Sequence, residues 1–123
     1  FHIERAEPYP VEYKACVKES MAELKAKARP ELARDVDVSG YDRVVVVFPN
    51  WCGTMPMPVY TFLEGHDFAG KEIWPLCTHE GRGMGQIEQH VAKACPGATV
   101  IEGLAIKGSN AAASADAVAA WLA

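Results

Sequence analysis

The chain has 123 residues, half of them apolar, which suits one domain built around one core. Its net charge is −4, and no cluster of Lys or Arg is long enough to follow a nucleic-acid backbone. The longest apolar runs are far shorter than the ~20 residues of a membrane span, and the first residues lack the apolar core of a secretory signal. We therefore expect residues 1–123 to form a single soluble, cytoplasmic domain that binds neither nucleic acid nor membrane.

The first third of the chain predicts a strand and then an amphipathic helix. Residues 1–4 alternate apolar and polar side chains before Pro8, which is typical of a short strand and an extended turn. From Val11 apolar or small residues recur at helical spacing until Pro30 ends the segment. We expect this helix to cover one face of a sheet. A polar connector follows it.

The most apolar stretch of the chain runs from Val44 to Phe48. Four of its five residues are β-branched and none is polar, so it predicts a central strand of a parallel sheet, covered on both faces. Pro49 ends the strand, and a proline-bounded loop leads to a short helix over 58–63. This loop follows the carboxyl end of a strand, where open α/β sheets bind ligands. We therefore expect the ligand site here.

The second half of the chain continues the alternation of strand and helix. Gly103 interrupts the last predicted strand, and Ser109 or Asn110 is the expected cap of the last helix. The whole pattern predicts the α/β class with a parallel sheet of about four strands. The remaining elements are a strand over 72–77, a glycine-rich loop over 78–85, a helix over 87–95, a strand over 99–106 and an alanine-rich helix over 110–122.

Several short motifs occur in a characteristic order along essentially all of the chain. They are Glu7-Pro8-Tyr9-Pro10, Tyr41-Asp42, the run from Phe48 to Pro58, Cys77-Thr78-His79-Glu80-Gly81, Cys95-Pro96-Gly97-Ala98 and Glu102-Gly103-Leu104. Together they make the chain resemble the flavodoxins and flavodoxin-like FMN proteins. The resemblance implies electron transfer with a redox partner protein. It implies an enzyme only in the sense of an FMN-dependent oxidoreductase.

The resemblance also implies which residues hold FMN. Trp51 has an aromatic surface on which the flavin ring can stack, and Gly53 lets the backbone approach the ring closely. A peptide near Gly53 that reorients beside flavin N5 is implied as well. The implied FMN-binding residues are Pro49, Asn50, Trp51, Cys52, Gly53 and Thr54 on one side of the ring, and Thr78, His79, Glu80 and Gly81 on the other.

The sequence departs from the family pattern at its start. Members of the family begin with a strand, a phosphate-binding loop and a helix, whereas this sequence begins at what would be their second strand. The expected fold is therefore a truncated flavodoxin-like sheet that lacks the family's first, central strand. Since strands lie ~4.8 Å apart, the strands at 1–4 and 43–48 would stand about two spacings apart, with unpaired backbone groups facing the gap. Either the first strand slides against the second, another chain supplies a strand, or the natural protein contains the missing segment.

The missing strand also changes how the sheet is covered. With strands adjacent in chain order and right-handed crossovers, the three connecting helices fall on one face, and only the last helix covers the other. The strand at 44–48 then has a bare side, which predicts a homodimer through the uncovered sheet face or edge. The competing function is an FMN-free truncated domain that acts as a dimerising structural or binding module.

The FMN phosphate has two alternative positions in the sequence. Ser109-Asn110, with Lys107 nearby, and Gly81-x-Gly83-x-Gly85 each precede a predicted helix, whose N-terminus attracts anions. A helix cap at Ser109 and a plain helix entry after the glycines are the simpler interpretations.

Other chemistries rest on the cysteines and histidines. Trp51-Cys52-Gly53 resembles the start of a thioredoxin motif, but Met55 stands at the second cysteine position, so dithiol exchange is not available. A nucleophilic Cys52, or a metal site of Cys52, Cys77 and His79, is a less favoured alternative. The four cysteines contain no Cys-x-x-Cys pair and are expected to be reduced and mostly buried. His66 and His90 are interpreted as surface residues.

Overall fold

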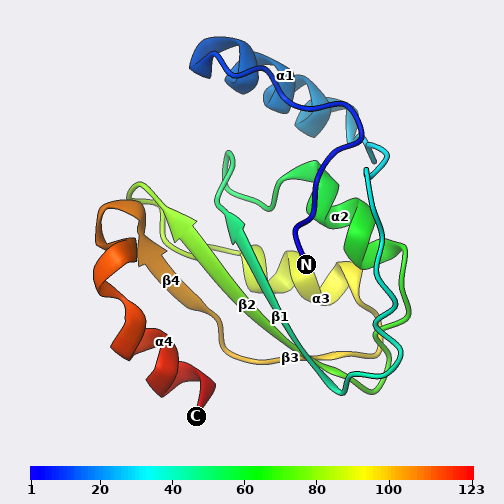
Figure 1. The fold of residues 1–123 in the computed structure, drawn as a ribbon, viewed down its shortest axis with the longest axis vertical. Coiled ribbons are helices and arrows are strands. Elements are labelled where there is room, and N and C mark those ends of the chain that lie inside the picture. Colours follow the sequence, from blue (N-terminus) through cyan, green and yellow to red (C-terminus); the bar gives the residue numbers. More distant parts are fainter.

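The computed structural model describes residues 1–123 as an open parallel sheet flanked by helices (Figure 1). It confirms the predicted α/β class with four strands. The strands are β1 (Arg43–Pro49), β2 (Glu72–His79), β3 (Thr99–Val100) and β4 (Leu104–Lys107). The helices are α1 (Tyr13–Ala26), α2 (Met57–Glu64), α3 (Ile87–Ala94) and α4 (Ala115–Leu122), with a 3-10 turn η1 (Gly108–Ala113) before α4.

The sheet is organised around β2. β1 pairs with one edge of β2, while β3 and β4 pair with the other, and every pairing is parallel. The predicted last strand forms as two pieces that Gly103 separates. A Cβ at Gly103 would lie 2.9 Å from the Pro75 carbonyl oxygen, so only glycine lets the chain pass β2 this closely. β1 is an edge strand, so the expectation of a central strand was wrong, because no strand occupies its other side.

Residues 1–4 do not form the predicted strand. Arg5 makes an isolated antiparallel bridge with Leu32. The Ala6 amide donates to the Glu31 carbonyl at 2.7 Å, and the Ala33 amide donates to the Glu4 carbonyl at 2.8 Å. The backbone groups of this segment are therefore satisfied by the connector at 31–33 and not by β1. The first segment has not slid into the gap.

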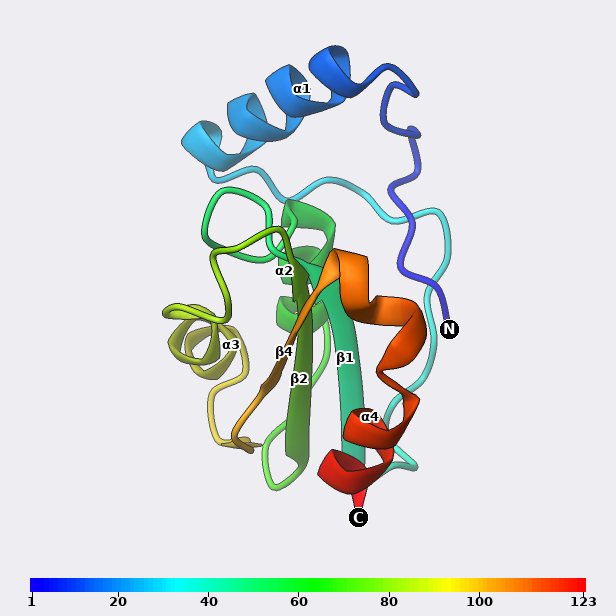
Figure 2. The ribbon, with the colours of Figure 1, turned by 90° about the vertical axis from the view of Figure 1, so that its left-hand side faces the viewer.

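Helix α1 lies beyond the carboxyl ends of the strands and not on a face of the sheet (Figures 1 and 2). None of its residues is buried. Ser20, Glu23 and Leu24 lie beside the loop that contains Trp51 and Cys52. The expectation that this helix covers the sheet was wrong. A crossover helix packs on the face between the two strands it connects, and residues 1–4 supply no first strand.

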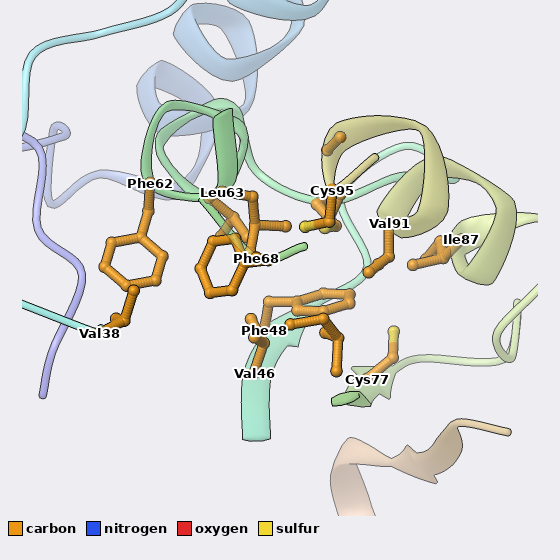
Figure 3. Packing of buried hydrophobic residues seen from close by; sticks show 14 residues of the cluster. Val38, Val46, Phe48, Phe62, Leu63, Phe68, Cys77, Ile87, Val91 and Cys95 are labelled. Atoms are coloured by element: carbon orange, nitrogen blue, oxygen red, sulfur yellow. The ribbon is translucent and has the colours of Figure 1, made fainter. Parts of the chain in front are cut away.

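Helices α2 and α3 cover one face of the sheet and enclose the core (Figure 3). On β1, Val46 and Phe48 point into this core and are 4% and 2% exposed, whereas Val45 and Val47 are 42% and 60% exposed. Only one face of β1 is covered, so the prediction of burial on both faces was wrong. The bare side that the missing strand predicts is present. The fully buried side chains include Phe68, Met55, Leu63, Ile73, Ile87, Val91 and Cys77.

Helix α4 lies on the opposite face, as expected (Figure 2). Trp121 packs against Trp74 of β2 in an edge-to-face contact with ring centroids 5.5 Å apart, and its Nε1 donates to the Glu102 carbonyl at 2.9 Å. The helix begins at Ala115 and is not capped by Ser109 or Asn110. Residues 108–113 instead form the 3-10 turn, a common connector before a helix. None of the helices is both long enough and apolar enough to cross a bilayer.

The two faces of β1 give a matched stability test. Val46→Thr places a hydroxyl in the core, where it lacks a partner, and should lower the free energy of unfolding by about 1–3 kcal/mol. Val47→Thr keeps the same shape at an exposed position and should change it by less than about 0.5 kcal/mol. Urea unfolding followed by circular dichroism measures both. Equal losses would contradict the assigned orientation of β1.

Candidate functional site

The two loops predicted to line FMN lie side by side at the carboxyl edge of the sheet. Pro49 is in register with Thr78 across the β1–β2 pair. Just beyond them, the Asn50 amide donates to the Thr78 carbonyl at 2.7 Å. Parallel pairing therefore brings together the segments 49–54 and 78–81, which are far apart in the sequence. The contact of these residues with FMN stays a prediction.

The side chain of Asn50 connects the two loops. Its Nδ2 donates to the Gly83 carbonyl at 3.0 Å, and its Oδ1 accepts from the Gly53 amide at 2.8 Å. One amide group thus bonds to the loop after β1 and to the loop after β2. Replacing it leaves a donor and an acceptor without partners, one in each loop.

Residues 51–54 form a tight two-residue turn. The Trp51 amide donates to the Thr54 carbonyl at 2.9 Å, and the Thr54 amide donates back at 3.2 Å. Both central residues have positive φ, +57° at Cys52 and +86° at Gly53, as a type I′ turn requires. Glycine adopts this conformation freely, whereas Cys52 is strained there. Beside Gly53 the only side chain near a Cβ position is Arg82, with Nη1 at 3.5 Å, so this stretch of backbone is accessible to a flat ligand.

Thr54 anchors this turn to two helices. Its buried hydroxyl lies 2.6 Å from Tyr60 Oη in α2 and 2.9 Å from His90 Nδ1 in α3. The interpretation of His90 as a surface residue was wrong. His90 follows Ile87 by three positions, which places both on the same side of α3, and this spacing is a signal that sequence reasoning missed. His66 was also misplaced, since its side chain is only 15% exposed and bonds Asp35 at 2.7 Å.

Trp51 is held from outside the sheet by Tyr9. The two rings meet edge to face, with centroids 5.2 Å apart and an interplanar angle of 81°. The Tyr9 hydroxyl hydrogen-bonds the Glu23 carboxylate, and burial together with this carboxylate raises the pKa of Tyr9 above its ordinary value. The Arg5 guanidinium lies 3.7 Å from the Tyr9 ring centre and 3.1 Å from Glu23 Oε2.

These contacts connect the N-terminal segment and α1 to the loop at 49–54. The Arg5 and Glu23 side chains are 8% and 12% exposed, so their ion pair is largely shielded from water. The Glu7-Pro8-Tyr9-Pro10 motif indicates the family but not this packing, because Tyr9 and Trp51 are distant in sequence. Tyr9 is therefore a site residue that only the structure shows.

The side chains of His79 and Glu80, in the second predicted loop, make different contacts. His79 Nδ1 accepts from the Gly81 amide at 2.9 Å and shapes the second loop. Glu80 turns toward the end of β4, where a Cβ on Gly108 would lie 2.3 Å from its Oε1, so its carboxylate lies against that strand end.

The cysteine chemistries find little support in the structure. Burial raises the pKa of Cys77 to about 11, which keeps its thiol protonated at neutral pH. Cys77 and Cys95 are buried, Cys16 is half-buried and Cys52 is exposed. Cys52, Cys77 and His79 do not form a metal-binding cluster, and no three His, Cys, Asp or Glu side chains gather closely enough to hold an ion.

The residues of the chain fit the ring of FMN better than its phosphate. Trp51, the accessible backbone at Gly53 and the loop 78–81 supply a stacking surface and backbone polar groups at one edge. Ser109 is exposed within η1, and no α-helix begins there to attract a phosphate. The glycine loop over 81–85 leads into α3, but its Gly83 carbonyl is engaged by Asn50.

Comparison with known proteins identifies the family of the chain. The family model described as flavodoxin matches residues 5–123. The chain belongs to the flavodoxin family. No curated protein matches it.

Solved structures of flavoproteins share the flavodoxin-like fold. A protein classed as a flavoprotein from Bacteroides uniformis is 27% identical with a TM-score of 0.83, over 99% of this chain and 79% of that chain. A second, from Bacteroides eggerthii, is also 27% identical with a TM-score of 0.75, over 97% of this chain and 80% of its own. A flavoprotein from Lactobacillus acidophilus, solved in complex with FMN, is 19% identical with a TM-score of 0.68, over 98% of this chain and 78% of its own.

Substitutions of Asn50 test whether its side chain holds the two loops of this flavodoxin-family chain together. Asn50→Ala should lower the free energy of unfolding by about 1–3 kcal/mol, because it leaves the Gly53 amide and the Gly83 carbonyl unpaired. It should also speed hydrogen exchange at the Gly53 amide. Asn50→Asp keeps the acceptor for Gly53 and removes the donor to Gly83, so it should leave exchange at Gly53 slow. Slow exchange in both variants would show that the amide does not hold the turn.

Proposed function

We propose that this chain binds the isoalloxazine ring of FMN between the loops at 49–54 and 78–81 and serves in electron transfer. The observation that carries the proposal is the Asn50 bridge, which holds the Trp51 turn and the second loop at one edge of the sheet. Membership of the flavodoxin family supports it. So does the fold shared with a flavoprotein solved with FMN.

Each part of the site has a physical role in this proposal. Trp51, fixed by Tyr9, provides the stacking surface. The positive-φ peptide between Cys52 and Gly53 presents backbone polar groups to the edge of the ring. FMN itself supplies the redox chemistry, and the protein orients the ring and shifts its potentials through these contacts. A redox partner protein would approach at the carboxyl edge of the sheet.

Titration with FMN and with riboflavin tests the proposal. The fluorescence of each flavin should be quenched when it binds. The dissociation constants of FMN and riboflavin should lie within about tenfold of each other, because residues 1–123 contain no loop that matches the FMN phosphate. Trp51→Leu should weaken the binding of both flavins by roughly fivefold, because stacking on an aromatic ring contributes about 1 kcal/mol beyond buried area.

Trp121→Leu is the matched control, since Trp121 lies on the other face of the sheet against Trp74. It should leave both affinities unchanged. The proposal fails for this chain if neither flavin is quenched at ~50 µM, a concentration well above a micromolar dissociation constant.

A second candidate function is a dimerising module, and the bare face of β1 favours it. Val45, Val47 and Tyr41 are 42%, 60% and 62% exposed and lie on or beside one strand. Burying such a patch against a second copy would remove apolar surface from water. We propose a two-fold dimer through this face.

Light scattering at micromolar concentration tests the dimer. The wild-type chain should show twice the 13.3 kDa of one copy. Val47→Asp would bring two like charges together across the two-fold axis and should give a monomer. Val11→Asp changes a fully exposed valine just before α1, the helix that lies beyond the carboxyl ends of the strands, and should stay dimeric. A wild-type monomer would rule out the dimer.

A further inference from the structure

Three charged side chains form a cluster beside Tyr9. Nη1 of Arg5 lies 3.1 Å from a carboxylate oxygen of Glu19 and 3.1 Å from one of Glu23. No second Lys or Arg pairs with either carboxylate. The side chains of Arg5 and Glu23 are only 8% and 12% exposed, so water screens this cluster poorly. One positive charge therefore faces two negative charges, and one negative charge is in excess.

The Tyr9 hydroxyl points into this excess negative charge. It donates to Glu23 Oε1, while Glu23 Oε2 accepts from Arg5. Burial and the Glu23 carboxylate raise the pKa of Tyr9, so the hydroxyl holds its proton at neutral pH. If Glu23 took that proton, Arg5 and Glu19 would remain as one balanced pair, which a poorly hydrated site favours. The hydrogen bond therefore joins a proton donor to a base whose protonation balances the charges of the cluster.

Arg5 also affects how Tyr9 can be oxidised. Its guanidinium carbon lies 3.7 Å from the centre of the Tyr9 ring. A cation is attracted by the electron-rich face of a neutral aromatic ring and is repelled by a ring that has become positive. Loss of an electron from Tyr9 is therefore favoured only when the hydroxyl proton leaves at the same time. Glu23 is in place to accept it.

The electron of Tyr9 has a direct route to Trp51. The two rings meet edge to face with centroids 5.2 Å apart, so no other group separates them. An indole that has lost an electron is a strong enough oxidant to take one from a phenol whose proton passes to a base. Trp51 and Tyr9, with Glu23 behind them, have the order that such a transfer requires.

We propose that Tyr9 and Glu23 form a proton-coupled electron donor to Trp51. When a one-electron oxidant removes an electron from the Trp51 indole, Tyr9 returns one electron to it. The O–H bond of Tyr9 breaks in the same step, and its proton bonds to Glu23 Oε1. The products are a neutral indole, a neutral tyrosyl radical and a neutral carboxylic acid, so one positive and one negative charge disappear together. The transfer restores the oxidised Trp51 ring, and it goes beyond flavin binding and does not require it.

Flash oxidation of the protein without flavin tests the proposal. The oxidant is a ruthenium tris-bipyridine complex that a light flash oxidises in the presence of a cobalt(III) acceptor. Transient absorption then follows the indole and tyrosyl radicals. In the wild-type chain an indole radical should decay as a tyrosyl radical appears, and deuterated water should slow this step by about twofold or more, because a proton moves with the electron. Trp51→Phe should abolish the step.

Two variants separate electron donation from a purely structural contact with Trp51. Tyr9→Phe keeps the ring and removes the hydroxyl, and it should lengthen the lifetime of the indole radical by about tenfold or more. Glu23→Gln keeps an oxygen that accepts from Tyr9 but is too weak a base to take the proton, so it should have the same effect. Tyr41→Phe is the matched control. Tyr41 is 62% exposed and lies just before β1, and its replacement should leave the lifetime unchanged.

Three outcomes would overturn the proposal. The first is an equal lifetime of the indole radical in the wild type and in Tyr9→Phe. The second is the absence of any effect of deuterated water. The third is a tyrosyl radical that forms at an unchanged rate in Trp51→Phe. If circular dichroism shows that Glu23→Gln does not fold, Tyr9→Phe and the effect of deuterated water decide. Since no flavin is present, these results are independent of the flavin titrations.

Discussion

The parallel pairing of β1 with β2 is the constraint on which the rest of the structure depends. Its register, from Arg43 with Glu72 to Pro49 with Thr78, brings two distant loops to one edge of the sheet. The same pairing uses one edge of β1 and leaves the other free, because the segment at 1–4 bonds the connector instead. The candidate flavin site and the free edge of β1 are therefore two consequences of one strand pair.

The loops at this edge are held by contacts with each other and with other parts of the chain. Asn50 joins the two loops, Thr54 is bonded to α2 and α3, and Trp51 rests on Tyr9. A turn with positive φ at Cys52 is strained by itself and persists because its surroundings over-determine it. The arrangement fits a site that must present the same surface to a rigid, flat ligand each time it binds.

Much of the fold follows from local patterns in the sequence. The apolar run at 44–48 predicts a strand, and Gly103 predicts the break in the last one, since both depend on the residues themselves. The predictions that were wrong concern segments whose structure depends on a neighbouring segment. The pattern at 1–4 is that of a strand, but a strand forms only where a neighbouring strand bonds its backbone groups. Because residues 1–4 do not form that strand, α1 does not connect two strands of the sheet and does not pack on its face. Within the site, the loop residues were predicted by resemblance, whereas Tyr9 and His90 are brought in by tertiary packing.

We propose that the loops after β1 and β2 bind a flavin ring. An amide NMR spectrum recorded with and without riboflavin tests it most directly, since riboflavin carries the ring without the phosphate. We expect shifts of the Gly53 and Gly81 amides and no shift of Gly97. Gly97 lies just before β3, and its carbonyl accepts from the Gly70 amide ahead of β2, so it is near the opposite end of the strands. Unshifted Gly53 and Gly81 amides at saturating riboflavin, or shifts confined to the end near Gly97, would contradict it.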